Sequence, residues 1–102
     1  MASRVAQFEA LVGQQPGNAL FRFSLAQALT AENRHAEAIP HFEACVASRA
    51  DWMMPRILLG KALLHEGRKN EAKPLLSDAL KLAIEQSHED PEREVRALLE
   101  GL

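Results

Sequence analysis

The chain has 102 residues, of which 47% are hydrophobic, and a formal net charge of −2, which is the size and balance of one small globular domain. This near-neutral charge argues against nucleic acid as a partner, and no apolar run approaches the roughly 18 residues of a membrane span or resembles a signal peptide. The single cysteine, Cys45, excludes an internal disulfide and a cysteine zinc site. We therefore expect a cytoplasmic protein without contacts to nucleic acid or membrane.

Apolar residues at helical spacing predict about six helices and no strand. In chain order these helices cover residues 3–13, 18–31, 35–48, 52–66, 69–87 and 90–102. Asn18, Asp51 and Asp90 are the expected capping residues of the second, fourth and sixth helices, and Pro91 follows its cap at the first helical position.

Two prolines and two turn residues recur at a fixed distance in the chain. Asn33 and Gly67 both tolerate the left-handed backbone that a tight turn after a helix requires, and they lie one period apart. Pro40 and Pro74 also lie one period apart, early in their helices, where the lost amide donor costs little. We expect a slight bend or a 3₁₀-like start in these two helices rather than a break.

That period is 34 residues, because the chain matches itself when it is shifted by this distance. The matching residues are small or apolar: Leu25, Ala26, Leu29, Ala38 and Phe42, against Leu59, Gly60, Leu63, Ala72 and Leu76. Ala26 and Gly60 are expected to let two helices approach closely, and the other eight are predicted to be buried. Such a repeat indicates stacked helix pairs, in which each pair covers the bare apolar face of its neighbour.

These residues resemble the tetratricopeptide repeat, with its Leu-Gly or Leu-Ala step and its later Ala-x-x-x-Phe. The resemblance implies an all-α, right-handed stack of antiparallel helix pairs forming an α–α superhelix. It divides the single domain into a half-repeat or capping helix (1–18), two repeats (19–52 and 53–86) and a C-terminal capping helix (87–102). The chain departs from the family pattern at Arg22 and Arg56, which replace the usual aromatic residue, and at Ala50 and Ile84, which replace the closing proline.

Arg22 and Arg56 have two interpretations. They could line a shared surface for an acidic partner, or each could cover apolar surface while pairing with an acid such as Glu43 or Asp78. The second interpretation is favoured, because long basic side chains commonly pack in this way.

In proteins similar to this family, partners lie in the concave groove formed by the first helix of each pair. The matching positions here are mostly apolar with a few polar residues: Leu20, Phe23, Gln27, Thr30, Met54, Ile57, Lys61, Leu64 and His65. This set suits an apolar peptide or an amphipathic helix. It lacks the Lys and Asn arrangement that chaperone-tail-binding members use for a terminal carboxylate. The terminal helices could cover part of this face.

No pattern in the chain indicates catalysis or a cofactor. Cys45 matches Ala79 one period later and is expected to be a buried filler, and the four histidines lack metal-ligand spacing. No nucleophile–base pair, phosphate loop or carboxylate dyad is visible. We therefore expect a non-enzymatic module that binds a peptide or helix of another protein, without metal or cofactor. The alternative is a structural module that self-associates into a homo-oligomer.

Overall fold

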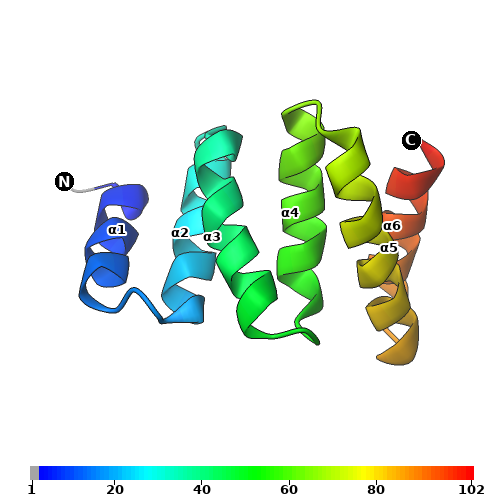
Figure 1. Cartoon of the computed structure of the whole chain (residues 1–102), viewed down its shortest axis with the longest axis horizontal. Helices are drawn as coiled ribbons and strands as arrows, with labels where there is room; N and C mark the ends of the chain where they lie inside the picture. Colours follow the sequence, from blue (N-terminus) through cyan, green and yellow to red (C-terminus); the bar gives the residue numbers. More distant parts are fainter. Residues whose placement is uncertain (1–2) are drawn as a thin grey trace.

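The computed structural model describes residues 3–102, which form six helices and no strand. The helices are α1 (Arg4–Gln14), α2 (Ala19–Ala31), α3 (His35–Ser48), α4 (Met53–His65), α5 (Lys69–Glu85) and α6 (Glu89–Glu100). They form an elongated stack of 40 × 26 × 21 Å (Figure 1). The predicted all-α stack is thus confirmed, and the predicted helix boundaries are correct to within two residues.

The four inner helices form two antiparallel pairs, α2 with α3 and α4 with α5. The terminal helices α1 and α6 lie at opposite ends of the stack, α1 against α2 and α6 against α5 (Figure 1). Because consecutive helices run in opposite directions, α2, α4 and α6 all begin at the same edge of the stack. The first helices of successive pairs are therefore neighbours with a common direction.

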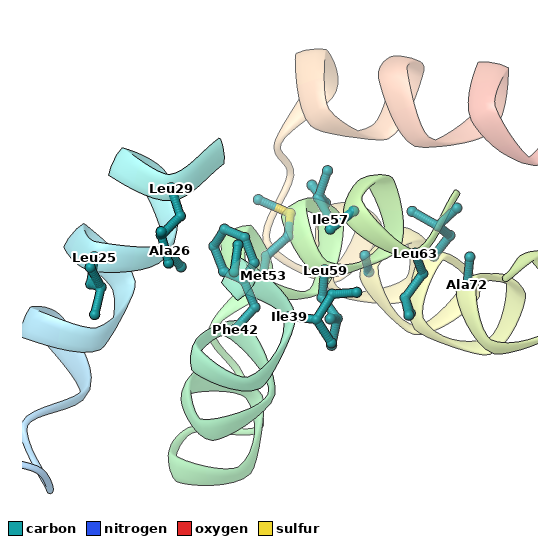
Figure 2. Close-up of a cluster of buried hydrophobic side chains, with 14 of the residues drawn as sticks. Leu25, Ala26, Leu29, Ile39, Phe42, Met53, Ile57, Leu59, Leu63 and Ala72 are labelled. Atoms are coloured by element: carbon teal, nitrogen blue, oxygen red, sulfur yellow. The ribbon is translucent and has the colours of Figure 1, made fainter. Parts of the chain in front are cut away.

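The predicted core residues are all buried. Leu25, Leu29, Leu59 and Leu63 are at most 4% exposed, and Ala38, Phe42, Ala72 and Leu76 are inaccessible to solvent. Figure 2 shows part of this cluster, with side chains from α2, α3, α4 and α5 meeting between the helices. The small residues serve close packing: a Cβ atom added to Gly60 would lie 2.6 Å from a methyl carbon of Leu76.

Three helices are each followed by one residue with a left-handed backbone conformation. Asn33 (φ 60°) and Gly67 (φ 74°) confirm the prediction, whereas Ser87 (φ 57°) was not anticipated. In each case the amide of the following residue donates to a carbonyl five residues back, at 2.8–2.9 Å: Arg34 to Leu29, Arg68 to Leu63 and His88 to Ala83. This closure satisfies carbonyl groups that a helix end leaves free.

Of the three predicted caps, only Asn18 is confirmed, since its side chain accepts from the Phe21 amide at 3.1 Å. Asp51 is not a cap, because Trp52 occupies the N-cap position of α4 in extended conformation and Asp51 instead lies 3.9 Å from Arg49. Asp90 is not a cap either: α6 begins one residue earlier, after His88. Pro91 then becomes the third helical residue, where an amide still lacks an intrahelical partner and its loss is tolerated.

The two helices with internal prolines remain α-helical from their first residue, so of the two expected features, a slight bend or a 3₁₀-like start, the 3₁₀-like start is wrong. Pro40 and Pro74 each stand at the sixth helical position and therefore each leave one carbonyl, of Ala36 and Asn70, without its usual amide. Both of these residues are exposed. Water can therefore satisfy the two carbonyl groups.

Candidate functional site

The predicted site residues form two parallel rows on neighbouring helices. Leu20, Phe23, Gln27 and Thr30 follow one face of α2, and Met54, Ile57, Lys61, Leu64 and His65 follow the matching face of α4. Between the rows lies a hollow of about 240 Å³, lined by Gln27, Thr30, Ala31, Phe42 and Leu58. We call the surface made by the two rows and this hollow the groove.

The groove begins with exposed apolar side chains. Among residues 3–102, three large hydrophobic side chains are exposed: Leu20 (64%), Met54 (40%) and Ile84 (49%). Leu20 and Met54 occupy the same phase of the repeat at the start of α2 and α4, whereas Ile84 lies on α5 outside the groove. Two neighbouring helices therefore present an apolar side chain at the same edge of the stack.

Phe23 and Ile57 also occupy the same phase, but their surroundings differ. Phe23 is half-buried, and its ring packs edge-on against Trp52 at 4.9 Å and against Phe42 at 6.1 Å between ring centroids. Ile57 is only 2% exposed and lies on the side of α4 toward α6 (Figure 2). Ile57 is thus a core residue, and a partner in the groove has no direct access to it.

The far half of the α4 row is engaged by other parts of the chain. Lys61 forms an ion pair with Glu94 of α6, and Leu98 of α6 joins Lys61, Leu64 and His65 around a shallow hollow of about 360 Å³. The His65 ring stacks on His35 of α3 with 4.0 Å between centroids. The freely accessible part of the groove is therefore the α2 row together with the start of α4.

Trp52 and Leu58 belong to the groove but were not among the predicted site residues. Trp52 precedes α4 and contacts Phe23 across the repeat boundary, and Leu58 lines the hollow between α2 and α4. The signal for Leu58 was its position four residues after Met54, on the same helix face. Trp52 could not be placed by helical phase, because it lies in the turn before the helix.

The two repeat-related arginines hold the chain together locally. Arg22 donates from Nε to the carbonyl of Pro16 at 2.6 Å, and Arg56 donates to the carbonyl of Ala50, which lies one period after Pro16. Arg56 also pairs with Asp78 at 3.6 Å, as predicted, whereas Arg22 contacts His41 at 3.2 Å and not Glu43.

The contact between Arg22 and His41 has an electrostatic consequence. Burial, with a further contribution from the Arg22 charge, lowers the pKa of His41, and Glu9 opposes this shift. A neutral His41 ring can accept from the guanidinium. Both arginines thus have partners within the fold, which favours the interpretation that they serve packing.

Chemically reactive groups are sparse in the part of the chain that the structure describes. Cys45 is fully buried and its Sγ lies 3.4 Å from the carbonyl oxygen of Ala19, and burial raises the pKa of its thiol to about 11. A thiol with a raised pKa is a poor nucleophile at neutral pH. Residues 3–102 contain no cluster of three or more His, Cys, Asp or Glu side chains suited to a metal ion, and no helix long and apolar enough to cross a membrane.

The comparison with known proteins agrees with this geometry. A family model of the tetratricopeptide repeat matches residues 19–51. No curated protein matches the sequence.

Two solved structures share the fold. One is the type III secretion translocator chaperone SycD of Yersinia enterocolitica, with a TM-score of 0.85 and 20% sequence identity over 92% of this chain and 66% of the SycD chain. The chain thus spans slightly less than two thirds of that chaperone. The other is protein BPP2914 of Bordetella parapertussis, with a TM-score of 0.80 and 23% identity over 98% of this chain and 87% of the other. Residues 19–51 thus match the tetratricopeptide repeat, and the two structures share the helical-repeat fold of the chain.

Proposed function

We propose that the protein is a non-enzymatic interaction module that binds a segment of a partner protein in the groove between α2 and α4. Tetratricopeptide repeats generally mediate protein–protein interaction. The observation that carries the proposal for this chain is the paired exposure of Leu20 and Met54 at the same edge of the groove. Exposed apolar side chains on neighbouring helices at one edge of a groove are typical of a binding surface, whereas single scattered ones are not.

The groove residues also suggest how a partner segment would be held. Phe23 and Trp52 support each other edge-on and so form a rigid apolar wall, which is the kind of anchor that dominates binding energy at interfaces. Gln27 is exposed beside the hollow and offers both a donor and an acceptor to a peptide backbone. A helix or an extended segment with an apolar side would fit this combination.

A pair of matched substitutions tests the proposal. Leu20→Glu places a charge in the groove, and Ile84→Glu places the same charge on another exposed apolar residue outside it. With each tagged variant as bait in an extract of the native cell, proteins recovered by the wild type should be lost with Leu20→Glu and kept with Ile84→Glu. Unchanged helical circular dichroism checks that both variants fold.

The opposite pattern contradicts the proposal: if Leu20→Glu recovers every partner, or if Ile84→Glu loses them, the binding surface lies elsewhere. Light scattering on the same proteins addresses the self-association alternative. A wild-type dimer that becomes monomeric with Leu20→Glu would assign the groove to a second copy of the chain.

A further inference from the structure

Two histidines from neighbouring helix pairs stack on each other at one edge of the molecule. His35 is the first residue of α3 and His65 is the last residue of α4, and both lie at the edge where α3 begins and α4 ends (Figure 1). Their ring planes are nearly parallel, at 3°, with 4.0 Å between the ring centroids. The stack therefore joins one antiparallel helix pair to the next.

The surroundings of His35 suit an uncharged ring. Its Nδ1 atom is buried, and among residues 3–102 it is the one buried side-chain nitrogen or oxygen without a hydrogen-bond partner. Both ring nitrogens carry a proton in the charged form of histidine, so a charged His35 would bury a donor without an acceptor, which is costly. The ring also lies at the positive end of the α3 helix dipole, which disfavours a further positive charge.

His65 has the opposite surroundings. Its side chain is exposed, and it ends α4, where the negative end of the helix dipole stabilises a positive charge. One proton on His65 therefore leaves the stack intact, because the ring beside it is neutral. A second proton, on His35, would place two positive charges against each other across 4.0 Å. The two rings consequently take up protons as a coupled pair.

No carboxylate compensates the second charge. Within residues 3–102, neither ring forms an ion pair with an Asp or Glu side chain. The charged groups of the adjoining helices and turns are paired with one another: Arg34 with Glu32 and Glu37, Lys61 with Glu94, and Arg68 with Glu71. Glu66, which follows His65, adds to the stabilisation of the Arg68 charge. The repulsion between two charged rings is therefore relieved only when the rings move apart.

We propose that His35 and His65 form a proton-sensitive junction between the two helix pairs. The stack holds while the two rings share at most one proton, and it opens when both rings are charged, so that His35 reaches water. Histidine changes charge between about pH 5 and pH 8, so mild acid drives this opening. Because His65 also borders the hollow beside Lys61 and Leu64, the far end of the groove changes with pH. The junction does not depend on the proposed function, and its test needs no partner protein.

A double-mutant cycle measures the junction. Urea unfolding of the wild type, His35→Gln, His65→Gln and the double variant gives the coupling between the two rings. At about pH 8 the coupling should favour the folded state by about two- to tenfold in the unfolding equilibrium constant, the range for packed ring pairs. At about pH 5 this preference should disappear or reverse. His41 is present in all four proteins, so its own contribution cancels.

A variant that keeps the stack without the charge provides the control. His65→Phe places a ring against His35 but cannot take up a proton, so its melting temperature should fall less than that of the wild type between about pH 8 and pH 5. His88→Gln, on the exposed turn before α6, should behave like the wild type. Amide hydrogen exchange at the end of α4 should be faster in the wild type than in His65→Phe at the lower pH and equal at the higher one.

Three results would overturn the inference. The first is the absence of coupling between His35 and His65 at about pH 8, which would mean that the rings do not stack. The second is a coupling of the same size at both pH values, which would mean that the stack tolerates two protons. The third is equal hydrogen exchange in the wild type and His65→Phe at the lower pH, which would mean that the junction does not open.

Discussion

The helices α2 and α4 occupy the same place in successive repeats and have similar buried faces, but beyond the first turn their groove faces differ. Leu25 and Leu59 are 2% and 3% exposed, and Ala26 and Gly60 both lie in the interior. On the groove side, Phe23 is partly exposed whereas its counterpart Ile57 is buried. Repeat-related residues are therefore alike in the buried core but differ in exposure on the groove side.

The neighbours of each helix explain the difference. The α4 helix lies between α2 and α6, and its Lys61 forms an ion pair with Glu94 of α6. Its counterpart Gln27 on α2 has no such partner on α4 and is exposed beside the hollow between the two helices. The exposure of a residue in the stack therefore depends on which helices lie beside its own helix.

The largest expected effect comes from removing that neighbour. Deleting residues 90–102 takes away Val95, which is fully buried, and uncovers Ile57, which lies on the side of α4 toward α6. Burying one valine side chain is worth about 1.5–3 kcal/mol, and each kcal/mol moves the melting temperature of such a domain by about 4–8 °C. We expect a fall of more than about 10 °C or aggregation, measured by circular dichroism and light scattering. An unchanged melting curve would show that α6 does not cover the stack.

The next effect tests whether the cores around α2 and α4 contribute equally to stability. Leu25→Ala and Leu59→Ala remove the same group from the same phase of the repeat, and each should cost about 2–5 kcal/mol in urea unfolding. The two losses should agree within roughly 1 kcal/mol if the two cores are alike. A loss below about 1 kcal/mol for either variant contradicts the assignment of that leucine to the core.

The interior was predictable from the sequence because it depends on residue size at a fixed spacing. Leu, Ala and Gly at the same phase in two copies admit one packing arrangement, and all eight predicted core positions are buried. The same spacing anticipated the left-handed turns at Asn33 and Gly67. The accessible groove was predicted less well, since helical phase treats Phe23 and Ile57 as equal.

The repeat pattern did not predict features that depend on a neighbouring helix or turn. The α5 helix has 17 residues where α3 has 14, so α6 begins outside the 34-residue register and its cap could not be placed from the period. Trp52 lies in a turn, where packing against Phe23 outweighs the capping preference of Asp51. The contact of Arg22 with His41 in place of Glu43 likewise depends on how α2 and α3 cross.

A pair of glycine substitutions sharpens the contrast between interior and surface. Gly60→Ala brings a methyl group within 2.6 Å of the fully buried Leu76 side chain and should destabilise the protein by about 1–3 kcal/mol. Gly13→Ala in α1 meets no atom within 4 Å and should stabilise it by about 0.4–1 kcal/mol. Urea unfolding of both variants measures the signs. A stabilising Gly60→Ala would mean that α4 and α5 do not approach closely.

The smallest expected effect is a pH dependence of stability. It is expected from His41, which contacts Arg22, whereas the repeat-related Arg56 pairs with Asp78 instead. Because the pKa of His41 is lowered in the folded protein, the unfolded chain takes up its proton first as the pH falls. Stability should therefore decline as the pH drops below about 6.5, and level off once the folded protein is protonated as well. Arg34 and Arg68 lower the pKa values of Glu37 and Glu71, so those carboxylates lose their contribution only in more acidic solution.

Urea unfolding between about pH 5 and pH 8 would measure this slope for the wild type and two variants. His41→Gln cannot be protonated, so its stability should vary less across this window. His88→Gln, on the exposed turn before α6, should retain the wild-type slope. If His41→Gln shows the same slope as the wild type, the contact between Arg22 and His41 does not govern it. Arg22 and Arg56 would then play the same part in the fold, since each donates to the carbonyl of a repeat-related residue, Pro16 or Ala50.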